Sequence, residues 1–93
     1  MSASPELMTM GADAGSLVRE SVEFHRLVLE KELELSQERI RGFEQAHHMT
    51  SAEFERKFND GTLGDERTWF DWLAEVEAAR HLKAKVESLR KLP

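Results

Sequence analysis

The chain has 93 residues, of which 33% are charged, and a formal net charge of -5 at pH 7. This length allows one small domain, and the acidic balance argues against a general nucleic-acid-binding protein, which needs excess lysine and arginine. The chain has no cysteine, so it offers neither a disulfide framework nor thiolate chemistry, which fits a reducing cytoplasm. No apolar stretch approaches a membrane span, and the start lacks the features of a signal peptide. We therefore expect a cytoplasmic protein with no membrane contact and no direct nucleic-acid contact.

Residues 1–15 are expected to form a flexible N-terminal tail, because they contain Pro5, Gly11, Gly15 and small polar residues. The alternative is a segment that becomes ordered on a partner. Residues 16–93 are expected to form one helical domain. Between Pro5 and the C-terminal residue there is no proline, and no run alternates apolar and polar β-branched residues, so strands are not expected.

The first helix is expected from about Ser16 to about His48, with Asp13 or Ser16 as its N-cap. Its apolar residues fall on two neighbouring stripes, which together cover about half of the helix circumference. The first stripe contains Val18, Val22, Leu29, Leu33, Ile40 and Phe43, and the second contains Leu17, Phe24, Val28 and Leu35. Since one partner helix cannot cover both stripes, we expect one to pack against the chain's own last helix and the other against a second subunit.

A short connecting helix is expected to begin after Thr50, which has the capping-box spacing with Glu53. Gly61 is expected to end it in a left-handed conformation, and Asp65 to cap the last helix. The apolar residues of that last helix repeat every seven residues, a pattern typical of left-handed helix pairing. The sequence thus predicts an all-α antiparallel helical hairpin (long helix, short connecting helix, long helix) that dimerises into a bundle through its first helix.

Five aromatic residues lie close together in sequence at the joint between the helices. They are Phe54, Phe58, Trp69, Phe70 and Trp72. We expect a small aromatic core that locks the hairpin, since such rings bury a large area. The alternative is an exposed anchor for a partner, because tryptophan is enriched at binding hot spots. Trp69 and Phe70 fit that role better than Trp72, which continues the seven-residue repeat.

At this joint the sequence resembles a group of short prokaryotic proteins that share the pattern F-E-x-x-F-x-x-G-x-L-G-D-x-x-x-x-F-x-W. All nine positions match, and the pattern covers about a fifth of the chain. The matching residues are Phe54, Glu55, Phe58, Gly61, Leu63, Gly64, Asp65, Phe70 and Trp72. Some members resemble the antitoxin half of toxin–antitoxin modules, so the resemblance implies a small basic toxin as partner. The family turn is typically very acidic after Gly-Asp, and Arg67 and Thr68 depart from that pattern.

The sequence contains one incomplete candidate metal site and lacks the common catalytic motifs. Glu44 and His47 have the Glu-x-x-His spacing of di-iron bundle sites, and His81 lies on the last helix. A second Glu-x-x-His motif is missing, so no metal and no cofactor is expected. The chain also lacks a glycine-rich phosphate loop, a nucleophile elbow and a cysteine nucleophile.

The sequence therefore predicts a small protein–protein interaction module, not an enzyme. In its most specific form it is antitoxin-like and neutralises a partner toxin by occlusion, with an apolar stripe and the acidic face of the first helix covering the toxin's site. The main alternative is a structural or adaptor coiled-coil subunit without a toxin partner, and a third is a metal-dependent bundle enzyme using Glu44, His47 and His81. The predicted partner or dimer interface consists of Val18, Val22, Leu29, Leu33, Ile40, Phe43, Trp69 and Phe70.

Overall fold

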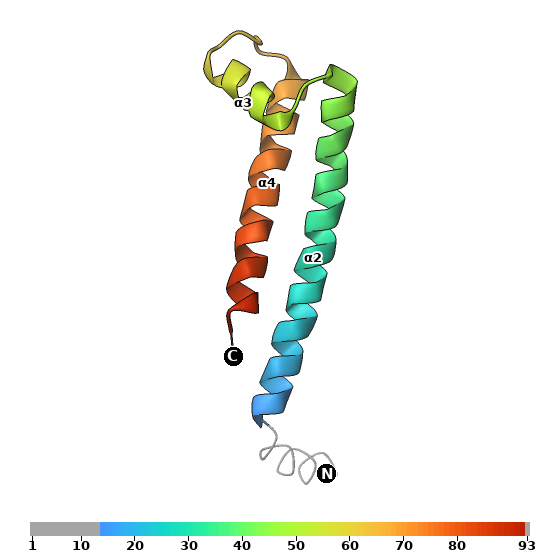
Figure 1. The fold of residues 1–93 in the computed structure, drawn as a ribbon, viewed down its shortest axis with the longest axis vertical. Helices are drawn as coiled ribbons and strands as arrows, with labels where there is room; N and C mark the ends of the chain where they lie inside the picture. Colours follow the sequence, from blue (N-terminus) through green and yellow to red (C-terminus); the bar gives the residue numbers. More distant parts are fainter. Residues whose placement is uncertain (1–13, 93) are drawn as a thin grey trace.

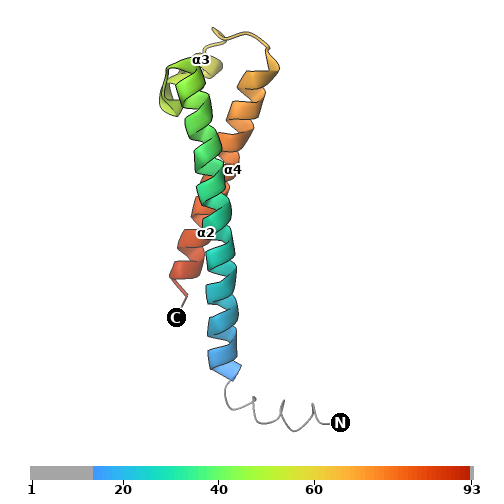
Figure 2. The same cartoon turned by 90° about the vertical axis from the view of Figure 1, so that its right-hand side faces the viewer.

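The computed structural model describes residues 14–92, and this part of the chain is a helical hairpin (Figure 1). Its described elements are α2 (Ala14–His47), α3 (Ser51–Asn59) and α4 (Arg67–Arg90). The two long helices run antiparallel side by side in both views, and α3 lies across the end at which the chain turns (Figures 1 and 2). The predicted all-α hairpin is confirmed. Most of the predicted tail, residues 1–13, lies outside the described residues.

The end of α2 is defined by a left-handed residue that is not glycine. His48 has a φ of 54°, and the amide of Met49 donates to the carbonyl of Glu44 over 3.3 Å. This bond, from the second residue past the helix to a carbonyl in its last turn, is that of a Schellman motif. The chain leaves the axis of α2 here and turns directly into α3.

The start of α3 matches the predicted capping box. The amide of Glu53 donates to Thr50 Oγ1 over 3.1 Å, and the amide of Thr50 donates to Glu53 Oε1 over 3.0 Å. A third bond ties α3 to α2, because the amide of Ser51 donates to Glu44 Oε2 over 2.8 Å. After α3, Gly61 has the expected left-handed backbone, with a φ of 74°.

The start of α4 differs from the prediction. The N-cap is Glu66 rather than Asp65, and its side chain makes no capping hydrogen bond. Gly64, with a φ of 85°, and Asp65 belong to the turn that brings the chain back toward α2. The helix therefore begins only at Arg67, and the residue at the cap position is a glutamate, which caps less readily than aspartate.

The register of the hairpin leaves part of α2 without a neighbouring helix. At 1.5 Å per residue, α2 is about 51 Å long and α4 about 36 Å. Arg90, the last residue of α4, donates to Glu30 of α2 over 2.7 Å. The N-terminal turns of α2 consequently extend beyond the end of α4, as Figure 1 shows.

Candidate protein-interaction surface

The aromatic joint is mainly a core that closes the hairpin. Phe54 and Trp72 are completely buried, and their rings stack with centroids 4.1 Å apart and planes within 3°. Phe43 stacks against Trp72 at 5.6 Å, and the indole Nε1 of Trp72 donates to Ser51 Oγ over 3.0 Å. These contacts join all three described helices. Trp72 and Phe43 therefore hold the chain together; Trp72 is closed to a partner, whereas Phe43 is only partly buried.

Of the two predicted aromatic anchors, Phe70 is the more accessible. It is 50% exposed and packs edge-on against Phe58, with ring centroids 5.4 Å apart. Trp69 is only partly exposed and lies over His47 at 4.7 Å. Its indole Nε1 is buried and has no hydrogen-bond partner in the structure. Phe70 is thus the aromatic side chain of the joint that a partner can reach most easily.

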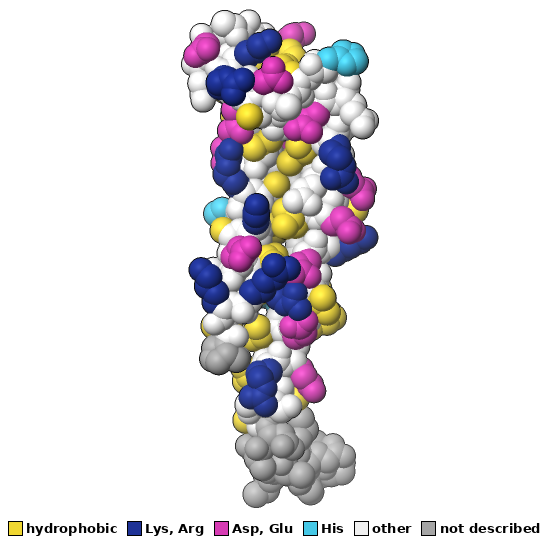
Figure 3. All heavy atoms as spheres, viewed as in Figure 1, with side chains coloured by type: hydrophobic (Ala, Val, Ile, Leu, Met, Phe, Trp, Pro, Cys, Tyr) yellow, Lys and Arg dark blue, Asp and Glu magenta, His cyan; other side chains and the backbone are white. Residues whose placement is uncertain are grey.

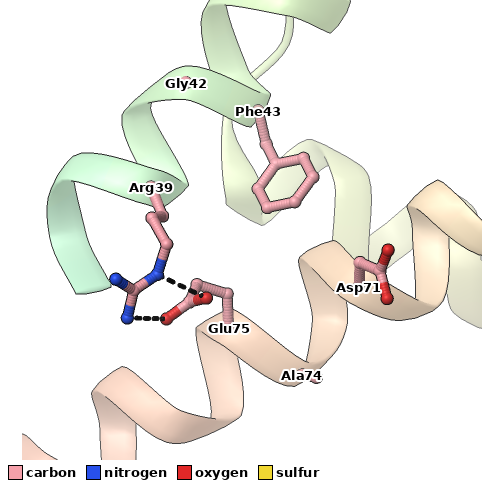
Figure 4. Close-up of a pocket in the computed structure, with 6 residues that line it drawn as sticks. All are labelled: Arg39, Gly42, Phe43, Asp71, Ala74 and Glu75. Atoms are coloured by element: carbon pink, nitrogen blue, oxygen red, sulfur yellow. Dashed lines mark hydrogen bonds and ion pairs between the residues drawn. The ribbon is translucent and has the colours of Figure 1, made fainter. Parts of the chain in front are cut away.

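A polar contact fixes α2 against α4 halfway along the hairpin. Ser36 is completely buried, and its hydroxyl donates to Glu75 Oε2 over 2.6 Å. Arg39 donates to both oxygens of the same carboxylate, over 2.9 and 3.1 Å (Figure 4). The bonds from Arg39, together with that from Ser36, hold the pKa of Glu75 below its usual value. A shift of one helix along the other would separate Ser36 and Arg39 from Glu75 and break these charge-assisted hydrogen bonds. The contact is therefore specific to this register of the two helices.

A shallow groove lies beside this contact, between α2 and α4. Its lining is Arg39, Gly42, Phe43, Asp71, Ala74 and Glu75. In Figure 4 the guanidinium of Arg39 and the carboxylate of Glu75 point toward each other, so their charges already satisfy one another. The groove presents no unpaired catalytic group, and we assign it no chemistry.

Most of the first apolar stripe packs within the chain. Leu29 is only 6% exposed, while Ile40 and Phe43 pack against the aromatic core. Leu33 lines a pocket between α2 and α4 together with Val76. These four residues of the predicted interface therefore lie on the side of α2 that faces the rest of the hairpin, where Leu29 is buried and the other three are partly buried. Of the other two members of the stripe, Val22 is half-buried, and Val18 is 61% exposed beyond the end of α4.

The apolar surface left uncovered lies on another side of α2. We call it the exposed apolar row, and it consists of Leu17, Val18, Phe24, Leu27, Val28 and Leu35. Phe24 is 70% exposed, the largest exposed fraction among these side chains. Hydrophobic side chains reach the surface along the lower half of α2 in Figure 3. The second predicted stripe supplies four of the six residues, and Leu27 was not identified from the sequence because it belongs to neither stripe.

Charged side chains lie along the same turns of α2 and pair with one another, and Glu20 and Glu23 lie beside Phe24 and Leu27 of the row. Arg26 bonds to both Glu23 and Glu30, and Lys31 donates to Glu34 over 2.9 Å. The hydrogen bond from Arg90 and the neighbouring Arg26 lower the pKa of Glu30. An apolar centre with a charged rim is the usual composition of a protein-binding surface.

The side chains proposed for a metal-dependent enzyme do not converge. The carboxylate of Glu44 accepts from the amide of Ser51, and His47 stacks against Trp72. His81 lies nine residues beyond Trp72 on α4, which is about 14 Å along the helix. Among residues 14–92, no group of three or more His, Cys, Asp or Glu side chains is placed to hold a metal ion. Within the same range, each helix is too short or too polar to cross a membrane.

A comparison with protein-family models, with curated proteins and with solved structures found no match for the chain.

Proposed function

We propose that the chain is a small protein–protein interaction module and that the exposed apolar row of α2 is its binding surface. The supporting observation is that six large apolar side chains remain exposed on one helix of a chain that is 33% charged. Burying one such side chain stabilises a complex by about 1.5–3 kcal/mol. Several large apolar side chains exposed on one helix of a small domain mark an interaction site.

In its specific form the module is antitoxin-like, acts in the prokaryotic cytoplasm and neutralises a small basic toxin by occlusion. Two features support this form. Acidic side chains flank the row on α2, which favours encounter with a basic protein; they are Glu20, Glu23, Glu30, Glu32, Glu34 and Glu38. The joint also carries the nine-position pattern that resembles antitoxin-like proteins.

The alternative, a structural or adaptor coiled-coil subunit without a toxin partner, has its own supporting observation. Leu17 and Phe24 are seven residues apart on α2, as are Val28 and Leu35. This spacing is that of a coiled-coil seam, which can hold a subunit in an assembly without inhibiting anything.

Growth rescue tests the antitoxin form. The product of the neighbouring gene is expressed alone, and then together with the wild-type chain or with a variant. We expect it to stop growth alone, the wild-type chain to restore growth, and Phe24→Glu to lose the rescue because a charge enters the apolar row. Leu92→Glu is the matched control, since Leu92 is also an exposed apolar residue but lies outside the row, beyond the end of α4. A toxic neighbour that the wild-type chain does not neutralise, or a neighbour without toxicity, rejects the antitoxin form.

A further inference from the structure

The spacing of the exposed apolar row is symmetric along α2. From Leu17 to Phe24 is seven residues, from Phe24 to Val28 is four, and from Val28 to Leu35 is seven. Steps of seven and four residues connect a and d positions of a coiled coil, so these four side chains form one seam. The order seven, four, seven reads the same from either end, and its midpoint is Arg26.

We propose that a second copy of this chain covers the exposed apolar row, with the two α2 helices antiparallel about a two-fold axis level with Arg26. In this pairing Leu17 lies against Leu35 of the second copy, and Phe24 against Val28 of the second copy. Each contact then occurs twice, as a two-fold interface requires. The inference rests on the proposed function, since it takes the same row as the binding surface. It names a second copy as the occupant, which favours the self-associating subunit over a toxin bound at that row.

The remaining two residues of the row fit the same arrangement. Val18 follows the seam position Leu17, and Leu27 precedes the seam position Val28. Both therefore flank the seam at the e and g positions, which lie at the edges of a coiled-coil interface. Leu27 lies next to the axis and meets Leu27 of the second copy. All six large apolar side chains exposed on α2 are thus covered by one contact.

The charges at the seam favour an antiparallel pair over a parallel one. Lys31 occupies a seam position and is already bonded to Glu34 over 2.9 Å. In the antiparallel pair Lys31 lies opposite Ser21 of the second copy and within one turn of its Glu20. The ammonium group then lies between two carboxylates and offsets their mutual repulsion. A parallel pair instead places Lys31 against Lys31, where like charges destabilise the contact.

The hairpin leaves enough room for this pair. On an α-helix, Leu17 and Leu35 are each about 120° away from Leu29, which faces α4. A second α2 can therefore approach from that side without displacing α4. The two helices overlap over residues 14–38, about 37 Å or three and a half heptads, which is a length that sustains a coiled coil.

Light scattering of the wild-type chain, two variants and their mixture tests the register. The wild-type chain is expected at twice its mass of 10.7 kDa. Phe24→Glu and Val28→Lys are each expected to weaken self-association at least about a hundredfold, because every substitution enters the interface twice. Mixing the two variants should restore a dimer that contains one chain of each. In that dimer the introduced glutamate at position 24 lies against the introduced lysine at position 28 of the other chain. At the second, symmetry-related contact the native phenylalanine still lies against the native valine. Both side chains are exposed in the hairpin, so circular dichroism should show unchanged helix content.

Cross-linking tests the orientation, and the absence of native cysteine makes it simple. His25→Cys places two thiols within about 3 Å along the axis of an antiparallel pair, whereas Glu38→Cys separates them by about 36 Å. A short bismaleimide should join the first variant efficiently and the second poorly. Equal cross-linking of both variants indicates a parallel pair and overturns the inference.

The outcomes separate this inference from the proposed function. A wild-type chain that stays monomeric, or a Phe24→Glu variant that still dimerises, overturns the second copy as partner. Leu92→Glu should dimerise like the wild-type chain, because Leu92 is exposed but lies outside the row. If the monomeric wild-type chain still neutralises the toxin and Phe24→Glu does not, the proposed function stands alone. If the dimer forms as described but growth is not rescued, the antitoxin form is lost and the self-associating subunit remains.

Discussion

His48 holds a left-handed backbone conformation at a position where most helices place glycine. An L-residue in this conformation loses roughly 1–2 kcal/mol relative to its right-handed state, whereas glycine loses little. We therefore expect His48→Gly to raise the free energy of unfolding by about 1 kcal/mol in urea titrations. The adjacent His47→Gly is the control, because it places glycine inside the helix and removes the ring that stacks against Trp72. A gain in stability for His47→Gly, or a loss for His48→Gly, contradicts this account of the helix end.

Two glycines should respond in opposite directions to a larger side chain. Gly61 has a φ of 74°, so Gly61→Val is expected to lower the free energy of unfolding by more than about 1 kcal/mol. Gly42 lies within α2, and a Cβ there would meet nothing within 4 Å. Gly42→Ala should therefore raise stability by about 0.5–1 kcal/mol through helix propensity alone. Thermal melts of the two variants check both signs, and an unchanged melting temperature for Gly61→Val would argue against the left-handed turn.

At the scale of the helices, Glu75 joins α2 to α4 and makes the pairing sensitive to pH. Its pKa is lowered from 4.5 mainly by Arg39, so the folded state favours the charged carboxylate. The resulting stability is fully present above pH 4.5 and is lost as the pH falls through the lower pKa of the folded state. We expect Glu75→Gln to be less stable than the wild-type chain by about 1 kcal/mol at pH 7, and this difference to shrink as the pH falls below 4.5.

Denaturant titrations between pH 3 and 7 measure this difference. Glu77→Gln is the matched control, because Glu77 bonds only to Arg80 on its own helix and does not bridge the two. Its stability should differ little from that of the wild-type chain over the whole range. A constant difference between Glu75→Gln and the wild-type chain at all pH values would mean that the carboxylate charge is not what joins the helices.

Local features of the helices could be predicted from the sequence, and the pairing of faces could not. The capping box of Thr50 and Glu53 and the turn at Gly61 follow from residues close in sequence, and the structure has both. The end of α2 carries no glycine, so its left-handed residue leaves no signal. Which apolar stripe of α2 faces α4 depends on Ser36 and Glu75, whose contact spans 39 residues. No local pattern marks a serine as a buried partner of a distant carboxylate.

For the same reason, the candidate surface in the structure differs from the interface that was predicted from the sequence. The sequence showed that α2 has more apolar surface than one helix can cover, and both stripes were visible in its periodicity. The register then placed Leu29, Ile40 and Phe43 inside the hairpin and left Phe24 and Val28 outside. The candidate surface is therefore mainly the second stripe, although the predicted interface was drawn mainly from the first.

For the whole molecule, the small core makes stability depend on assembly. Five hydrophobic residues are buried within residues 14–92; they are Leu29, Phe54, Trp72, Val76 and Val86. A core of this size gives a marginal monomer, and an interface that forms only between folded chains adds to its stability by mass action. If a second copy covers the exposed apolar row, the thermal midpoint must therefore rise with protein concentration. A tenfold increase in protein concentration favours the dimer over separate chains by about 1.4 kcal/mol per mole of dimer.

Melting curves over a hundredfold range of concentration measure this dependence. The wild-type midpoint is expected to rise steadily, because dilution shifts the equilibrium toward separate chains that unfold more easily. Phe24→Glu should melt at one temperature throughout, close to the wild-type midpoint at the lowest concentration, since Phe24 lies outside the core of the hairpin. If the wild-type midpoint does not change with concentration, the hairpin is stable as a monomer. A partner other than a second copy would then have to cover the exposed apolar row.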